Sequence, residues 1–259
     1  MEKESNIFER YEQKYIVDKT QKALLEQAFM PYMEKDLYYH SLVRSIYLDT
    51  ENHRLIRKSL EGETYKEKIR IRSYKTTGDG DLLFLELKKK YKGKVYKRRI
   101  EVGEQALIDW LNNAKPLPES QIAREIEYFK TFYGDLHPDV FISACRTSYV
   151  AKKDAGLRIT FDEDVKWRDA DLTFKKDPYG DDLLDKNACI MEVKTGRAYP
   201  LWLCELLSGM HVYHRSFSKC GEAYKIRAER NKKKPREMGD ELCQQAYSTA
   251  SSMPLIRSL

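Results

Sequence analysis

Charged and apolar residues alternate with a period of two along several stretches of this chain, the pattern of β-strands that bury one face. In residues 65–74, Lys68, Arg70 and Arg72 share one face, and Ile69 and Ile71 share the other. The alternation predicts strands over residues 10–17, 65–74, 81–91, 94–102, 140–149, 157–164 and 189–196.

Apolar residues with helical spacing predict helices between these strands. The segments are residues 19–33, 104–114, 119–134, 200–209 and 216–231. A Lys92-Gly93 pair separates two of the strands and is typical of a tight hairpin turn. Because strands outnumber helices and short turns connect many of them, the pattern predicts an antiparallel, strand-rich α+β fold.

The domain organisation follows from where the composition changes. No repeat and no Gly/Ser linker interrupts residues 1–230, which we expect to form one domain. Residues 231–259 are first basic and then polar, with Pro235 near their start, and we expect a flexible C-terminal tail there.

The repeated charged strand faces suggest how the sheet is arranged. A single charged face would simply meet water, but several such strands favour a closed barrel with helices around its outside and a polar interior. The cations expected to line this interior are Lys14, Lys68, Arg70, Arg72, Lys88, Lys97, Arg99, Arg146, Arg158 and Lys194.

Composition limits the class of protein. The 259 residues are 41% apolar, which is enough for a core, and no apolar run reaches the roughly 18 residues of a membrane helix. The N-terminus lacks a secretory signal, and the five cysteines form no CxxC pair. We therefore expect a soluble, cytoplasmic protein with reduced thiols and no structural zinc.

Charge indicates the kind of ligand. The 47 Lys and Arg residues exceed the 41 Asp and Glu residues only slightly, so the placement of the cations matters more than their excess. Like charges gathered in a partly desolvated cavity repel one another, and a linear phosphate chain would neutralise them. Aromatic residues are not interleaved with the basic ones as in single-strand nucleic-acid binders, so we expect no nucleic-acid partner.

Nine segments occur in an order that resembles a known family. They are RYEQKY (10–15), SIYLDT (45–50), KIRIRSY (68–74), LELKKK (85–90), KVYKRR (94–99), CRTSY (145–149), LRITFDED (157–164), MEVKTGRAYPLWL (191–203) and SFSKCGEAY (216–224). The chain resembles the catalytic domain of the vacuolar transporter chaperone family, the polyphosphate polymerases among the triphosphate tunnel metalloenzymes. The resemblance implies transfer of the ATP γ-phosphoryl group to the end of a polyphosphate chain, with Mn²⁺ or Mg²⁺ as cofactor.

The resemblance also assigns roles to residues. It implies that Glu192 holds the metal, that Lys14 lies beside the nucleotide phosphates, and that Ser218 and Lys219 contact phosphate near the tunnel mouth. The residues that would grip the triphosphate are Arg70, Arg72, Lys88, Lys97, Arg146 and Arg158. Glu12, Lys68, Arg99 and Lys194 complete the expected substrate-binding set.

The first strand favours transfer over hydrolysis. Hydrolytic relatives begin with an E-x-E-x-K strand, whereas this chain has Arg10 at the first of these positions, followed by Glu12 and Lys14. The loss of a carboxylate weakens a second metal site, and hydrolysis needs an activated water more than transfer does. A second departure is Ala144, where family members often have Tyr.

Several alternatives stay open at this stage. The chain could be a tripolyphosphatase or nucleoside triphosphatase, or a non-catalytic module that binds polyphosphate or inositol phosphates. Asp162 is a second metal ligand or, more simply, a salt-bridge partner. A membrane-protein partner or an anionic membrane surface also stays open, and the sequence does not determine the oligomeric state.

Overall fold

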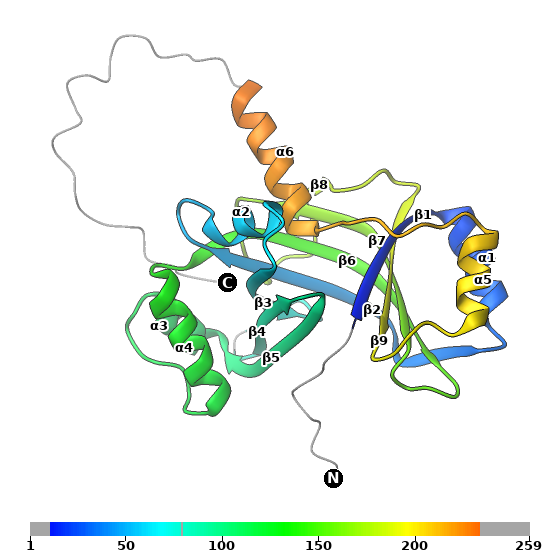
Figure 1. Cartoon of the computed structure of the whole chain (residues 1–259). Coiled ribbons are helices and arrows are strands. Elements are labelled where there is room, and N and C mark those ends of the chain that lie inside the picture. Colours follow the sequence, from blue (N-terminus) through cyan, green and yellow to red (C-terminus); the bar gives the residue numbers. More distant parts are fainter. Residues whose placement is uncertain (1–10, 79, 234–259) are drawn as a thin grey trace.

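The computed structural model describes residues 11–78 and 80–233 (Figure 1). Its strands are β1 (Tyr11–Asp18), β2 (Met33–Asp49), β3 (Tyr65–Ser73), β4 (Leu82–Tyr91), β5 (Lys94–Gly103), β6 (His137–Ala151), β7 (Arg158–Arg168), β8 (Asp181–Asp182) and β9 (Ala188–Thr195). Its helices are α1 (Lys19–Phe29), α2 (Arg54–Leu60), α3 (Glu104–Leu111), α4 (Gln121–Tyr133), α5 (Leu201–Gly209) and α6 (Lys219–Lys233). The predicted α+β class is therefore confirmed.

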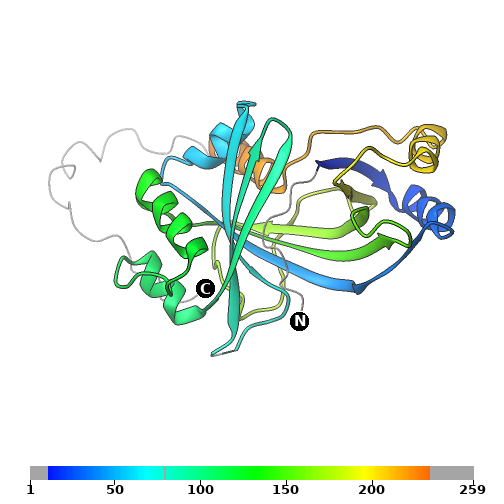
Figure 2. The same ribbon diagram turned by 60° about the horizontal axis from the view of Figure 1, so that its bottom comes forward.

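The strands form one antiparallel sheet in the order β1-β9-β7-β6-β2-β3-β4-β5, with β8 paired to β7. Strand β2 is long enough to belong to both halves of the sheet. Its first part pairs only with β6, whereas its last part pairs with β3 as well. A register shift between Lys35 and His40 bends the strand. The β3-β4-β5 ribbon, which pairs with the last part of β2, crosses the other strands steeply (Figure 2).

The expected closed barrel is not confirmed, because hydrogen bonds do not join the two edge strands of the sheet. Strands β1 and β5 approach to within 8 Å between Cα atoms, yet they are not paired. Part of the free edge of β1 is already occupied: the backbone N–H of Arg215 donates to the carbonyl of Lys14 at 2.8 Å. The segment between α5 and α6 thus contacts the edge of β1 at Lys14.

Local sequence explains the main turns and caps. Lys92 and Gly93 both have positive φ, as the predicted two-residue hairpin turn requires. Asp18 and Gln21 form a capping box at the start of α1. The sequence pattern missed α2, which is only seven residues long and begins where the Asp49 carboxylate accepts from the backbone N–H groups of Leu55 and Ile56.

Two hydrophobic clusters cover the convex side of the sheet. One joins β3, β4 and β5 to α3 and α4 through residues such as Ile69, Leu85 and Phe129. The other joins β1, β7 and β9 to α1 and α5 through residues such as Phe161 and Leu203. Because alternate residues of each strand are buried in these clusters, the intervening charged residues lie on the concave side.

The concave side is covered only in part. Helices α2 and α6 contact each other and lie over the same region of the sheet (Figure 1). A third cluster fills this region with residues such as Ile56, Ile142 and Cys220. The rest of the concave side carries charged residues such as Lys14, Arg70 and Glu192, and we call it the charged face.

Helix α6 extends the last predicted helix to Lys233. Arg10 and residues 234–259, which include most of the predicted tail, lie outside the described residues. Within the described residues, no helix is both long enough and apolar enough to cross a membrane.

Candidate functional site

The charged face brings together side chains from seven strands and the start of α6. Its cations are Lys14, Lys68, Arg70, Arg72, Lys88, Lys97, Arg99, Arg146, Lys194 and Lys219, and its carboxylates are Glu12, Glu86, Asp162 and Glu192. Cations thus outnumber carboxylates by more than two to one, which leaves a local positive excess for an anion to neutralise.

Glu86 on β4 holds the cations of the ribbon in place. It is almost fully buried, with 1% of its side chain exposed, and it accepts from Arg70 Nε at 2.8 Å and from Arg99 Nε at 2.7 Å. Lys97 Nζ lies 2.7 Å from the same carboxylate. Burial alone would raise the pKa of Glu86, but Arg70, Arg72, Lys97 and Arg99 hold it well below its usual 4.5.

Asp162 on β7 is a second buried carboxylate. It accepts a bidentate pair of hydrogen bonds from Arg146, at 2.6 and 2.7 Å, and a further bond from Lys219. These cations lower the pKa of Asp162 against the opposing effect of burial. The carboxylate is already shared by two cations, so the simpler of its two predicted roles, a salt-bridge partner, describes its geometry.

The middle of the charged face contains Glu192 and the lysines around it. Glu192 lies 3.1 Å from Lys194 Nζ on the same strand and is opposite Lys14 in the β1–β9 pairing. Burial acts to raise the pKa of Glu192, but Lys194, Lys14, Lys88 and Arg146 keep it well below 4.5. Glu192 is therefore ionised at neutral pH and in reach of cations from several strands.

An ion pair bridges the gap between β1 and the ribbon. Lys88 on β4 donates to Glu12 on β1. This contact joins β1 to the ribbon, with which β1 forms no strand pairing, so that both line the same face.

Two lysines on the charged face have pKa values near neutrality. Burial lowers the pKa of Lys14 from 10.5 to about 7, despite the opposing effect of Glu192. Burial likewise lowers the pKa of Lys97 to about 7, despite Glu86. Each would regain its proton readily if a phosphate lay beside it.

The start of α6 forms one border of the charged face. Lys68 Nζ donates to Ser218 Oγ at 2.8 Å, and Lys14 Nζ donates to the carbonyl of Phe217 at 3.0 Å. The structure therefore brings Ser218 and Lys219, expected near a mouth of the site, into contact with residues of the charged face.

Arg158 lies apart from this arrangement. It is opposite Lys194 in the sheet, but its side chain is 43% exposed and pairs with Asp36 at 3.0 Å. Arg158 is therefore at the rim, while the other predicted cations converge further inside.

Sequence reasoning assigned no role in the site to Glu86, Tyr47 or Tyr74. The Tyr47 hydroxyl accepts from Arg70 at 3.0 Å, and the Tyr74 hydroxyl accepts from Arg99 at 2.7 Å. Burial would raise the pKa of Tyr74, but Arg72 and Arg99 lower it. Glu86 could have been found, because its position in the alternation puts it on the same face as Lys88.

The donor set fits a metal held mainly by substrate. Among the described residues, no group of three or more His, Cys, Asp or Glu side chains is placed to hold a metal. Mg²⁺ is usually bound through one or two carboxylates plus phosphate oxygens, so a single ionised carboxylate such as Glu192 is compatible with it.

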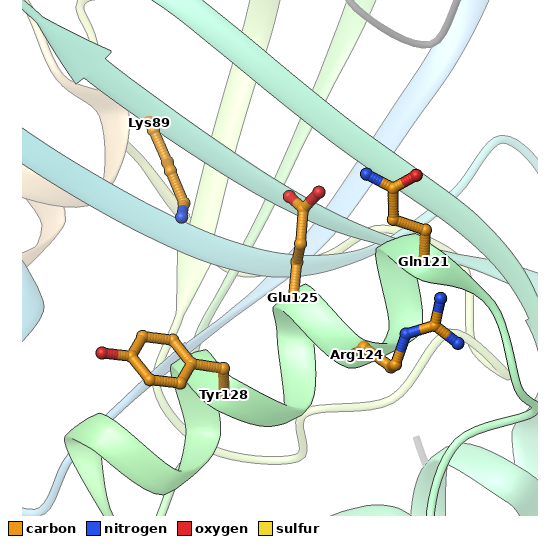
Figure 3. Close-up of a pocket in the computed structure, with 5 residues that line it drawn as sticks. All are labelled: Lys89, Gln121, Arg124, Glu125 and Tyr128. Atoms are coloured by element: carbon orange, nitrogen blue, oxygen red, sulfur yellow. The ribbon is translucent and has the colours of Figure 1, made fainter.

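A cavity of about 340 Å³ lies outside the charged face, between β4 and α4. It is lined by Lys89, Gln121, Arg124, Glu125 and Tyr128 (Figure 3). Lys89 is adjacent to Lys88 in the strand and therefore points to the opposite, convex side. The residues of this cavity therefore lie outside the charged face.

The structure is an antiparallel α+β fold in which buried cations and carboxylates converge on one face of the sheet. The model of the VTC domain family matches residues 9–227, and the chain belongs to this family. The resemblance stated from the sequence motifs is thereby confirmed.

One solved structure shares the fold at low sequence identity, and two others are less similar. A Bacillus halodurans protein provisionally described as an adenylate cyclase is 14% identical, with a TM-score of 0.55, covering 83% of this chain and 96% of its own. A Vibrio parahaemolyticus protein with the same provisional description is 10% identical, with a TM-score of 0.44, covering 83% of this chain and 98% of its own. The Mimivirus capping-enzyme triphosphatase is 10% identical, with a TM-score of 0.35, covering 80% of this chain and 89% of its own. No curated protein matches the sequence.

Proposed function

We propose that this protein is a polyphosphate polymerase that transfers the γ-phosphoryl group of ATP to the end of a polyphosphate chain on the charged face. The observation that carries the proposal is the convergence of Arg70, Arg72, Arg146, Lys88 and Lys194 around buried, ionised carboxylates. Guanidinium groups match phosphate oxygens in pairs, and ammonium groups add compact charge.

The chemistry needs alignment and charge neutralisation more than a protein nucleophile. A terminal phosphate oxygen of polyphosphate attacks the γ-phosphorus of ATP, a new P–O–P bond forms, and the bond to ADP breaks. The attacking oxygen is already ionised at neutral pH, so no side chain has to remove a proton. The cations neutralise charge on the transferring group and hold the two reactants in line.

The pairing of the carboxylates favours transfer over hydrolysis. Glu86, Asp162 and Glu192 each contact at least one cation within the charged face, and these cations lower the pKa of each carboxylate. A carboxylate held in this way has a lowered proton affinity and is a poor general base for water. This supports a phosphate acceptor, which brings its own charge.

Glu192 is the residue that we propose to hold the metal, because it is ionised and lies in the middle of the face. A divalent metal bound there would neutralise charge on the phosphate oxygens. We expect Glu192→Gln to shift the metal concentration needed for half-maximal activity upward by about tenfold, because one charged ligand is lost. Titration of Mn²⁺ and Mg²⁺ against activity measures this shift, and an unchanged metal requirement would contradict the assignment.

The test of the proposed function is incubation with ATP and Mn²⁺ or Mg²⁺. We expect long polymers that a polyphosphatase degrades. Orthophosphate without polymer would instead identify a hydrolase, and tight polyphosphate binding without either product would identify a binding module. Single-stranded DNA is the competitor that we expect to have no effect.

Arg70→Ala should lower the rate of polymer formation by a factor of about 100 or more, since removing one preorganised donor typically costs this much. The matched control is Arg124→Ala, which removes an exposed arginine from the cavity of Figure 3. If both variants lost activity equally, the charged face would not be the catalytic site that we propose.

A further inference from the structure

The β3-β4-β5 ribbon changes in chemistry from one end of its concave side to the other. The cross-strand pairs of β3 and β4 on this side are, in order, Lys66–Lys90, Lys68–Lys88, Arg70–Glu86 and Arg72–Phe84. By the same alternation, Tyr74 follows Arg72, and Leu82 lies next to Phe84 on this side. The row therefore begins with lysines, continues with guanidinium groups and ends with aromatic and apolar side chains.

The aromatic end contacts the guanidinium groups directly. The rings of Tyr74 and Phe84 meet edge to face, with their centroids 5.7 Å apart. The guanidinium carbon of Arg99 lies 4.3 Å from the centroid of the Phe84 ring, and that of Arg72 lies 5.8 Å from the centroid of the Tyr74 ring. Aromatic rings and guanidinium planes are the surfaces on which nucleobases stack in proteins.

The aromatic end is accessible to a ligand. Tyr74 is 40% exposed and Leu82 is 57% exposed. Within the part of the chain that the structure describes, neither these two residues nor Phe84 belongs to a hydrophobic cluster of the core. An accessible apolar surface beside buried cations is suited to a ligand that has both an apolar ring and an anionic part.

The opposite end of the row has ammonium groups only. Lys66 and Lys90 lie directly opposite each other, an arrangement of like charges that destabilises a sheet. Burial, together with Lys90 and Lys68, lowers the pKa of Lys66. The ammonium group of Lys66 donates to the carbonyl of Ser59 at 2.9 Å, which is an uncharged acceptor. A chain of phosphates at this end would relieve the repulsion.

We propose that the ribbon fixes the orientation of the phosphoryl donor: the nucleobase of a nucleoside triphosphate stacks at the aromatic end, on Tyr74, Phe84 and Arg99, and the γ-phosphate points toward the lysines. The inference rests on the proposed function, because it takes a nucleoside triphosphate as the donor. It adds which residues recognise the base and where the acceptor lies.

The length of the row is compatible with this orientation. A strand rises by about 3.3 Å per residue, so Phe84 and Lys88 are separated by about 13 Å along β4, which leaves room for a ribose and a triphosphate between base and acceptor. The acceptor polyphosphate at the lysine end and the leaving ADP at the aromatic end then lie on opposite sides of the transferring phosphoryl group. In-line displacement requires this arrangement.

The experiment measures by calorimetry the binding of three probes: the β,γ-imido analogue of ATP, linear tripolyphosphate and long-chain polyphosphate. Phe84→Leu keeps an apolar side chain but removes the ring, and the double variant Lys66→Met/Lys90→Met removes two charges at the lysine end. Tyr128→Leu is the matched control, because it removes an exposed ring from the cavity outside the charged face (Figure 3).

We expect Phe84→Leu to weaken binding of the ATP analogue about tenfold, since the loss of one base–aromatic stack costs about this much, and to leave tripolyphosphate binding unchanged. The lysine double variant should do the reverse: it should weaken binding of long polyphosphate about tenfold and leave the ATP analogue unaffected. Tyr128→Leu should bind all three probes as the wild type does.

Photolabelling of the wild type with 8-azido-ATP tests the orientation without a substitution. We expect adducts at Tyr74, Phe84 or their sequence neighbours, and adducts found only elsewhere would overturn the inference. Equal weakening of the ATP analogue and tripolyphosphate by Phe84→Leu would overturn it as well, although phosphate binding at the charged face would stand. If the wild type bound none of the three probes, the proposed function itself would fail.

Discussion

Glu86 contacts several cations of the β3-β4-β5 ribbon at once. Its buried carboxylate contacts cations from β3 and β5, and those cations would otherwise repel one another in a partly desolvated setting. The carboxylate therefore has a positioning role: it spaces Arg70 and Arg99 in the absence of ligand.

Replacing Glu86 with Gln should destabilise the unliganded protein by about 3 kcal/mol, because the buried cations lose their counter-charge. The same change should increase the stabilisation that tripolyphosphate provides, since the ligand now supplies the missing negative charge. Thermal unfolding with and without tripolyphosphate measures both effects. An equal increment of stabilisation in the variant and the wild type would contradict this role, and Glu119→Gln, on an exposed glutamate, is the matched control.

Lys14 and Lys97 make ligand binding dependent on pH. Their pKa values are about 7 in the unliganded protein. Because bound polyphosphate favours the charged form of both lysines, the protein takes up protons when the ligand binds above this pH. Affinity for tripolyphosphate should therefore fall as the pH rises through 7. The stability of the unliganded protein should change with pH in the opposite direction. Between about pH 7 and 10.5 these two lysines bind more protons in the unfolded chain than in the folded protein, so the free energy of unfolding increases with pH.

Calorimetry of tripolyphosphate binding in buffers of different ionisation enthalpy measures the proton uptake directly. Lys14→Met and Lys97→Met should each remove part of the proton uptake. The uptake that remains in the double variant comes from protonation of the ligand itself. Uptake that is the same in the double variant as in the wild type would show that these lysines do not titrate on binding.

At the level of elements, the segment between α5 and α6 contacts the free edge of β1. Its backbone occupies the Lys14 carbonyl through Arg215, while Lys14 itself reaches the Phe217 carbonyl. The two contacts tie β1 to the start of α6, where Ser218 and Lys219 lie. Strand β1 and helix α6 should therefore respond together when either one is perturbed.

Arg215→Pro tests this connection, because proline removes the backbone N–H that bonds to Lys14. We expect it to lower the free energy of unfolding by about 1 kcal/mol more than Arg215→Ala, which keeps the N–H group. Chemical denaturation measures the difference. Equal losses for the two variants would show that the hydrogen bond contributes nothing measurable.

The sequence predicted most of the elements because the alternation is strong where one face is charged and the other apolar. It missed β2 (Met33–Asp49), the longest strand, which none of the predicted strands covers. It also missed α2, whose cap comes from Asp49 and whose seven residues give little periodicity. It also extended the first helix to residue 33, although α1 ends at Phe29, before Pro31. Short elements and helix ends depend on caps and prolines more than on period.

At the scale of the whole molecule, the sequence predicted that the cations would converge but not how they are neutralised. Convergence follows from alternation, since alternate residues on adjoining strands share a face. The pairing of Glu86 with cations of two neighbouring strands, or of Asp162 with Lys219 of α6, depends on register and on contacts distant in sequence. The closed barrel was predicted from charge alone, which does not reveal that the chain before α6 occupies the edge of β1.

An open sheet has two outer strands, and exposed strand edges invite other molecules to pair with them. Here the segment at Arg215 shields part of one edge, and Lys97, Arg99 and Glu101 recur along the other. A second copy approaching β5 would have to desolvate this row of charges. The residues that we propose to hold phosphate would thereby also discourage fibre-like self-association, and neutralising them by mutation should make the protein more prone to aggregate.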